Sequence, residues 1–325
     1  MIPVKSVEGL MEAAHGYQRS MVLFVALRLD LFSALAGGAA DARGLARRVS
    51  ADPRGLSILL NSLVAMGLLR KTGTRYRNAG VARDFLASGP RSKRSILLHH
   101  LDCWGDWTGL EKKVRRGRGA RPREGDFQEN FIRGMEDNAR ERAAEVAARI
   151  PLRPGERVLD LGGGPGTYAL EWARRYPGSD LTVFDIPDTL RVTRKILREK
   201  GASSRVRLLD GDFLSDPLGG PYDFIWVSQI LHAYPEKQCV SILRRARGAL
   251  VPGGRVAVQE FLLEENRTAP AGPAFFSVHM VAVTEGGRAY SAGEVASMLR
   301  SAGFRKVAID PPDPRGVGIV HASKA

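Results

Sequence analysis

The chain has 325 residues, of which 44% are hydrophobic and 26% are charged, with a formal net charge of +14. This length suits about two domains, and the composition is that of a folded globular protein, which excludes a disordered or fibrous chain. No segment reaches the ~20 apolar residues that cross a bilayer, and the first residues lack the apolar core of a signal peptide. Two cysteines are too few for a disulfide framework or a cysteine-based zinc site. We therefore expect a cytoplasmic protein with no membrane partner.

The positive charge is concentrated in the first half. Residues 1–150 hold 26 Lys/Arg against 16 Asp/Glu, a net charge of +10, whereas the remaining residues hold 23 against 19, a net charge of +4. A basic half can indicate a nucleic-acid partner. An arginine-rich, solvated surface gives the same pattern, and we favour that interpretation.

The first ~90 residues predict short helices followed by a hairpin. Apolar residues recur at near-helical spacing over 17–35, which predicts one strongly buried helix. Asp41 and Asp52 each precede a further helix, because aspartate is a preferred N-cap residue. Residues 68–77 then predict a small hairpin. This order of elements is that of a winged helix.

A winged-helix-like domain has two interpretations. A DNA-binding regulator would use Arg54 and the basic hairpin to contact phosphates. A dimerisation module would bury its first helix against a second subunit. The middle helix presents Leu56, Ile58 and Leu59 where base-reading side chains are needed. We favour dimerisation and expect no nucleic-acid partner.

A group of possible metal ligands lies near residue 100 and comprises His99, His100, Asp102 and Cys103. Their spacing is not that of a recognised metal site, so we expect no metal. Residues 131–150 predict a long helix, which ends at Pro151. We therefore divide the chain into a winged-helix-like domain (1–100), a helical linker (101–150) and a second domain (151–325).

From residue 157 onward, strands and helices alternate, which predicts a doubly wound, Rossmann-like α/β sheet. Strands are expected over 157–161, 181–185, 206–209, 224–231, 255–260, 306–309 and 317–321. Helices are expected over 168–176, 189–200, 236–250 and 293–302.

A glycine-rich loop follows the first of these strands, with the pattern Asp160-x-Gly162-x-Gly164-x-Gly166. The dinucleotide fingerprint needs a glycine where this chain has Thr167, which disfavours a nicotinamide-dependent oxidoreductase. Glycines let the backbone approach a ligand closely, and Asp160 adds a carboxylate beneath the loop. A sulfonium amino acid suits this environment.

Two further acidic residues follow the next two strands. Asp185 is placed to accept hydrogen bonds from ribose hydroxyls, and Asp212 from an adenine amino group, with Phe213 packed on the ring. Ligands of open α/β sheets bind beyond the carboxyl ends of the strands. We therefore expect these side chains to converge on one crevice.

The strings VLDLGGGPG, FDIP, GDF, ILHAYPEKQCVSILRRARGAL and PGGRVAVQE resemble the class I small-molecule O-methyltransferases of the caffeic acid, acetylserotonin and bacterial natural-product type. The resemblance extends over nearly the whole chain, because the winged-helix-like region resembles the dimerisation domain of that family. It implies S-adenosylmethionine (SAM) as cofactor, a homodimer, and cofactor contacts from Ile186 and Ser228.

The resemblance also implies an acceptor pocket for a small aromatic molecule. Phe131, Met135 and Asn138 match the helix that roofs this pocket. Met280 and Thr284, with the neighbouring His279, fall in the segment that completes it.

His232 matches the catalytic histidine of the family, and Glu260 matches a carboxylate that orients it. The chain departs from the family at Ala233, where an aspartate is frequent, and around Ala289, where a second glutamate is expected. Three alternatives follow, in our order of preference. They are a working His232–Glu260 pair, catalysis by proximity alone, and a shift to C- or N-methylation or to a SAM-dependent reaction that transfers no methyl group.

Overall fold

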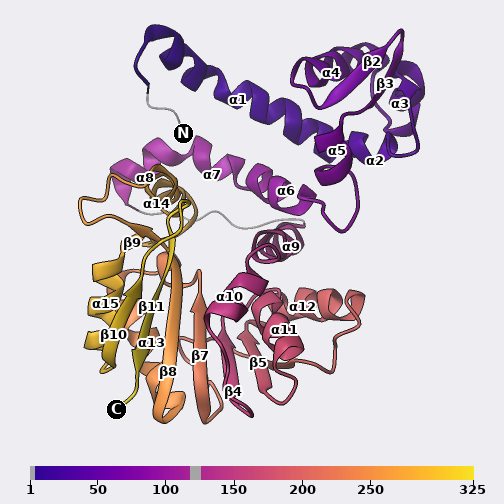
Figure 1. Ribbon diagram of the computed structural model, residues 1–325. Coiled ribbons are helices and arrows are strands. Elements are labelled where there is room, and N and C mark those ends of the chain that lie inside the picture. The colour runs from indigo at the N-terminus through magenta and orange to yellow at the C-terminus, as the bar shows by residue number, and fades with distance from the viewer. Residues whose placement is uncertain (1–3, 118–125) are drawn as a thin grey trace. The chain divides into compact units, whose positions relative to one another are not determined.

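The computed structural model describes residues 4–117 and 126–325 (Figure 1). The chain divides into two compact units, Met1–Asp102 and Cys103–Ala325. Among the described residues, no helix is both long enough and apolar enough to span a membrane.

The smaller unit is helical with a small three-stranded sheet of order β1-β3-β2. Its elements are α1 (Val7–Arg28), α2 (Leu31–Ala34), β1 (Ala40–Asp41), α3 (Ala42–Arg48), α4 (Pro53–Ala65), β2 (Leu69–Thr72), β3 (Arg75–Asn78), α5 (Gly80–Phe85) and α6 (Arg94–Asp102). A buried apolar cluster from α1, α2, α3 and α4 forms its core.

The predicted starts of α3 and α4 are confirmed. The Asp41 carboxylate accepts a hydrogen bond from the Gly44 N–H at 2.8 Å, and the Asp52 carboxylate accepts one from the Arg54 N–H at 3.1 Å. The single helix predicted over 17–35 is wrong. The chain forms two helices, because Asp30 adopts a left-handed conformation with φ of 53°, which aspartate tolerates better than most residues.

The larger unit is a central sheet with helices on both faces (Figure 1). Its helices are α7 (Trp104–Thr108), α8 (Leu110–Arg116), α9 (Phe127–Ala139), α10 (Ala143–Arg149), α11 (Thr167–Arg175), α12 (Pro187–Glu199), the 3-10 turn η1 (Leu231–Ala233), α13 (Glu236–Ala249), α14 (Ala271–Val283) and α15 (Ala292–Ser301). Its strands are β4 (Arg157–Leu161), β5 (Asp180–Asp185), β6 (Arg207–Asp210), β7 (Tyr222–Ser228), β8 (Leu250–Leu263), β9 (Tyr290–Ser291), β10 (Arg305–Asp310) and β11 (Val317–Ser323).

The strand order is β10-β11-β8-β7-β4-β5-β6, and the short β9 pairs with β8. Strands β4 to β8 run parallel to one another, as the crossover helices require. Strand β11 is antiparallel to both β8 and β10. The expected Rossmann-like arrangement is therefore confirmed, with one reversed strand near an edge.

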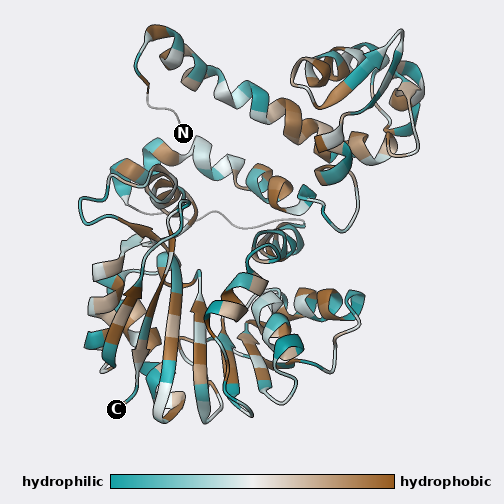
Figure 2. Cartoon of the chain, in the orientation of Figure 1, coloured by the Kyte–Doolittle hydropathy of each residue, from teal (hydrophilic) through white to brown (hydrophobic). Residues whose placement is uncertain are grey.

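Each face of the sheet carries its own apolar core. Along β4, Val158 packs with α10, α11 and α12, whereas the next residue, Leu159, packs with α13 and α15. This alternation follows from the pleat of a strand. Figure 2 shows the apolar residues along the central strands. Helix α9 packs on α12 through Ile132, Val192 and Ile196.

Three predictions in this unit need correction. The helix expected over 131–150 is two helices, because the charged run Arg140-Glu141-Arg142 interrupts the apolar stripe. Strand β7 ends at Ser228, and Leu231 belongs to η1 instead. Helix α14 was not predicted, since its residues are apolar all around and show no helical period.

Candidate functional site

The glycine loop joins β4 to α11 and has a left-handed backbone at three positions. Gly162, Gly164 and Gly166 have φ angles of 65°, 52° and 72°, which residues with a Cβ rarely adopt. A Cβ on Gly162 would also lie 2.4 Å from the Ile230 side chain, just before η1. The loop is therefore held close to the segment that carries His232.

Asp185 at the end of β5 fixes this loop from the neighbouring strand. Its carboxylate accepts hydrogen bonds from the Gly164 N–H at 2.9 Å and from the Ile186 N–H at 2.8 Å. Burial raises the pKa of Asp185, and these two backbone donors oppose the rise. Two of about four acceptor positions of the carboxylate are thus used by the backbone.

Asp160 lies beneath the loop and is only 1% exposed. A Cβ on Gly163 would lie 2.6 Å from its carboxyl carbon, so the carboxyl is packed directly against the loop backbone. Among the described residues, its Oδ2 atom has no hydrogen-bond partner. Burial, reinforced by the charge of Asp185, raises the pKa of Asp160 from 3.8 to about 7. A buried acceptor of this kind suits a ligand that brings a positive charge or a hydrogen-bond donor.

Replacing Asp160 with asparagine is expected to change how stability depends on pH. Without ligand, the folded protein keeps a proton on Asp160 between pH 3.8 and about 7 that the unfolded chain releases. Because the proton is released only on unfolding, the free energy of unfolding falls as pH rises through this window. Denaturant unfolding of both proteins at several pH values should show Asp160→Asn gaining relative stability up to about pH 7. Parallel curves for the two proteins would contradict the shift.

The other expected cofactor residues lie along the same edge of the sheet. Phe213 is 8% exposed, and its ring lies 3.5 Å from the position of a Cβ on Gly162. Asp212 is exposed and accepts a hydrogen bond from the Leu214 N–H at 2.8 Å. The Ile186 side chain is 43% exposed. The Ser228 hydroxyl is held by the Gln259 side-chain oxygen at 3.0 Å.

His232 and Glu260 form a close pair. The His232 Nδ1 and Glu260 Oε2 atoms are 2.6 Å apart, and the two side chains are 12% and 1% exposed. The other oxygen of Glu260 accepts a hydrogen bond from the Leu231 N–H at 2.8 Å. A carboxylate facing Nδ1 places the ring proton on that nitrogen, so the lone pair lies on Nε2. Such an arrangement is chemically able to serve as a general base.

The expected acceptor residues lie on helices α9 and α14 or directly after α14. Phe131, Met135 and Asn138 belong to α9. The Phe131 ring stacks with that of Phe127, with 6.2 Å between the ring centroids. Met280 lies in α14 and is 5% exposed. Thr284 follows α14, and its hydroxyl donates to the Met280 carbonyl and accepts from the Gly287 N–H. This hydroxyl therefore helps to end the helix.

Aromatic rings extend from His232 along α14. The Phe276 ring meets the His232 ring edge-on with 4.7 Å between centroids, and Phe261 lies 4.6 Å from Phe276. The Trp107 indole donates to His279 Nδ1 at 3.1 Å. The sequence does not predict this contact, because Trp107 and His279 are 172 positions apart and share no local pattern.

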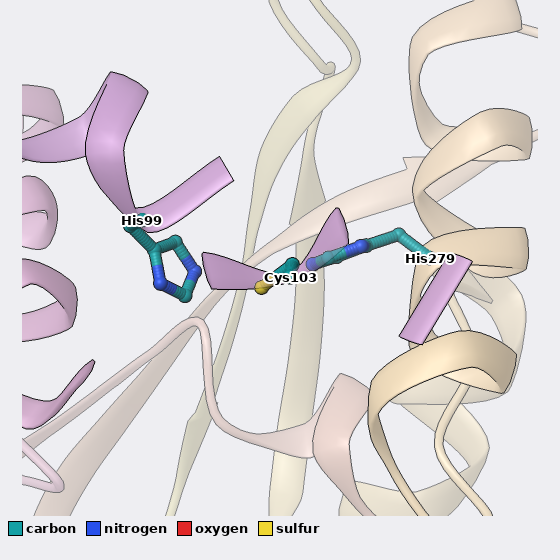
Figure 3. A group of neighbouring side chains, drawn as sticks. All are labelled: His99, Cys103 and His279. Atoms are coloured by element: carbon teal, nitrogen blue, oxygen red, sulfur yellow. The ribbon is translucent and has the colours of Figure 1, made fainter. Parts of the chain in front are cut away.

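Cys103 and His279 are neighbours in the larger unit, with potential ligand atoms within 4.8 Å of each other (Figure 3). Together they offer two donors, whereas zinc sites take three or four protein ligands. His279 Nδ1 also already accepts the Trp107 hydrogen bond. We therefore assign no metal to this pair.

The Gln259 side chain was also missed. Its Oε1 atom accepts hydrogen bonds from the Tyr168 hydroxyl at 2.9 Å and from Ser228 at 3.0 Å. The available signal was a polar residue directly after the apolar run Val256-Ala257-Val258 and inside a buried strand. A buried amide at that point indicates a polar contact across the sheet edge.

Two protein-family models match the chain. An O-methyltransferase domain matches residues 115–305, and an O-methyltransferase dimerisation domain matches residues 11–88. Together they cover the same two regions that the sequence motifs indicated.

Curated relatives and a solved structure agree with these matches. Acetylserotonin O-methyltransferase from Mus musculus molossinus is 35% identical over 95% of this chain and 86% of its own length. The 3-hydroxy-5-methyl-1-naphthoate 3-O-methyltransferase from Streptomyces sahachiroi is 30% identical over 97% of this chain and 95% of its own length. The crystal structure of human N-acetylserotonin methyltransferase in complex with SAM has a TM-score of 0.86 at 28% identity, covering 100% of both chains.

Proposed function

Because the chain belongs to the O-methyltransferase family, we propose that it methylates a ring hydroxyl of a small aromatic acceptor, with SAM as cofactor and His232 as general base. The observation that carries this proposal is the His232–Glu260 pair, 2.6 Å apart, next to the glycine loop.

The cofactor site fits SAM in its charge and in its backbone. The buried Asp160 Oδ2 is suited to the positively charged amino acid end of SAM, and the glycine loop admits that end closely. Asp185 retains acceptor positions for ribose hydroxyls. When bound, SAM supplies an electrophilic methyl group on a sulfonium. The proposed contacts are Asp160, Gly162, Gly164, Gly166, Asp185, Ile186, Asp212, Phe213 and Ser228.

His232 provides the proton acceptor that the reaction needs. A phenol has a pKa near ~10, so only a small fraction is ionised at neutral pH. Glu260 holds the ring through Nδ1, which leaves Nε2 to take the acceptor's proton. As the acceptor oxygen bonds to the methyl carbon, the bond from that carbon to the sulfonium sulfur breaks, and S-adenosylhomocysteine is the leaving group. No metal is needed for this step.

The aromatic acceptor is supported by the rings around His232. Phe276 and Phe261 form an apolar wall beside the base. Aromatic rings pack favourably edge-on or offset against such side chains. The Streptomyces relative carries in its name a naphthoate, which is an aromatic acceptor with a ring hydroxyl. The proposed acceptor contacts are Phe131, Met135 and Asn138 of the helical linker 101–150, and Met280 and Thr284 of the second domain.

An acceptor panel with a labelled methyl donor tests this function. We expect methyl transfer to hydroxynaphthoates and hydroxyindoles, and none to the same compounds already methylated at oxygen. Matched aryl amines and carbon nucleophiles serve as comparisons. NMR of each product locates the new methyl group, so methylation at nitrogen or carbon alone would contradict the oxygen assignment.

We also propose that the protein is a homodimer. Helix α1 exposes a series of apolar side chains: Val7 is 72%, Leu10 58%, Met11 48% and Tyr17 54% exposed. Such a face is typical of a contact surface. Sedimentation velocity should give twice the 35.4 kDa chain mass, and a monomer at micromolar concentration would contradict this. Both cysteines are buried and neither forms a disulfide, and this supports the proposal of a cytoplasmic location.

A further inference from the structure

The backbone of η1, which carries His232, is held by side chains on both its donor and its acceptor groups. On the donor side, Glu260 accepts the Leu231 N–H at 2.8 Å. On the acceptor side, the Tyr290 hydroxyl donates to the Tyr234 carbonyl at 2.6 Å, and the Cys239 thiol approaches the Leu231 carbonyl at 3.1 Å. The turn is therefore tied at both ends.

Tyr290 is a rigid donor because its own surroundings fix it. It lies in β9, pairs with Leu262 of β8, and is 1% exposed. The Arg288 guanidinium lies over its ring, 4.2 Å from the centroid, and is itself held by Glu294 at 2.8 Å. Burial raises the pKa of Tyr290 well above its usual range, so the phenol stays a donor at working pH.

Strand β8 is linked to both Glu260 and Tyr290, the two side chains that hold the turn. It carries Glu260, and two residues later it pairs with Tyr290. The segment before Tyr290 also lies directly against the turn, since a Cβ on Gly287 would lie 2.2 Å from the His232 carbonyl oxygen. Strand β8 thus carries Glu260, which contacts the His232 ring, and pairs with the strand that carries Tyr290, which contacts the backbone after His232.

Ala233 and Ala289 stand where the family has further acidic residues. Among the described residues, Glu260 is the carboxylate that contacts the His232 ring, so the placement of that ring depends more on the backbone of η1 than it does in a site with several carboxylates. We propose that Tyr290 is a positioning residue for His232, acting through the Tyr234 carbonyl. This inference rests on the proposed role of His232 as the base. Small errors in the placement of a catalytic group lower the rate strongly.

The test compares Tyr290→Phe with Tyr222→Phe. The Tyr222 hydroxyl donates to the Leu218 carbonyl at 2.9 Å and the residue is 3% exposed, so both variants lose a hydrogen bond from a tyrosine hydroxyl to a backbone carbonyl. Tyr290→Phe also loses the longer contact of the Cys239 thiol with the Tyr290 oxygen at 3.8 Å. We expect similar losses in Tm. Only Tyr290→Phe should lower kcat, by about tenfold or more, with an unchanged KM for SAM. Its pH–rate profile should also shift, whereas that of Tyr222→Phe should not.

A second readout does not depend on turnover. NMR of histidine labelled with ¹³C and ¹⁵N, with the His232 signals assigned by loss in His232→Gln, should show those signals moving in Tyr290→Phe but not in Tyr222→Phe. Cys239→Ala removes the second side-chain donor to the carbonyls of the turn and should give the same changes to a smaller degree. Unchanged kcat and unmoved His232 signals in Tyr290→Phe would overturn the proposal, whatever Cys239→Ala shows. If the wild type transfers no methyl group, the proposed function fails, while the NMR comparison still decides the role of Tyr290.

Discussion

Replacing His232 with glutamine is expected to lower kcat for a phenolic acceptor by about 100- to 10,000-fold at neutral pH. The imidazole is held by Glu260 at 2.6 Å and is 12% exposed, so it is oriented and still reachable. Glutamine retains polarity and similar size but cannot accept a proton at this pH. Binding of S-adenosylhomocysteine should stay within about threefold of wild type, because His232 is not among the proposed cofactor contacts.

The pH dependence separates lost base catalysis from lost structure. As pH rises toward the acceptor's own pKa near ~10, solvent ionises more phenol and the deficit of His232→Gln should shrink by about tenfold per unit. The control is His321→Gln, which breaks another histidine–carboxylate pair, 2.8 Å from Asp310. That variant should keep wild-type kcat. A deficit in His232→Gln that stays constant with pH would instead favour catalysis by proximity alone.

Replacing Asp185 with alanine is expected to raise the Kd for S-adenosylhomocysteine by at least about 100-fold. Each hydrogen bond to a charged group contributes about 1.5–3 kcal/mol, which is about tenfold or more in affinity per bond. The substitution removes the expected ribose contacts and also frees the Gly164 N–H, which Asp185 now holds at 2.9 Å. Titration calorimetry measures the change directly.

Asp180→Ala is the matched control for this experiment. Asp180 begins the strand that Asp185 ends, so it lies at the opposite end of the strand from the glycine loop. Its carboxylate forms an ion pair with Arg207 at 2.9 Å. Its loss should leave the Kd within about threefold, because surface ion pairs contribute little. Equal affinities for Asp185→Ala and Asp180→Ala would show that the cofactor does not use the end of β5. NADH serves as a comparison ligand and should not bind.

Features governed by local backbone chemistry were predictable from the sequence. Asp41 and Asp52 cap helices because an aspartate side chain reaches the first free N–H groups of the chain that follows it. The positions of the glycines predicted a loop that only glycine accommodates, and three of them have positive φ. The order of strands and helices from β4 to β8 followed for the same reason, since alternation and periodicity are local.

Features that depend on distant partners were not predictable in this way. The reversal of β11 depends on its pairing with β8. The Ser228 hydroxyl was assigned to the cofactor, yet it also bonds to Gln259, 31 positions away.

The sequence by itself therefore determined the parts of this protein: an O-methyltransferase-type chain with a glycine loop, two strand-end aspartates and a histidine followed by a distant glutamate. It could do so because each part is encoded by residue types at short, fixed spacings. Only the tertiary structure decided how the parts are held. It brings Glu260 to His232 across 28 positions and the Tyr290 hydroxyl to the Tyr234 carbonyl across 56. Such pairings arise from the order of strands in the sheet, because neighbours across a sheet are set by packing of the whole domain and leave no period in the chain.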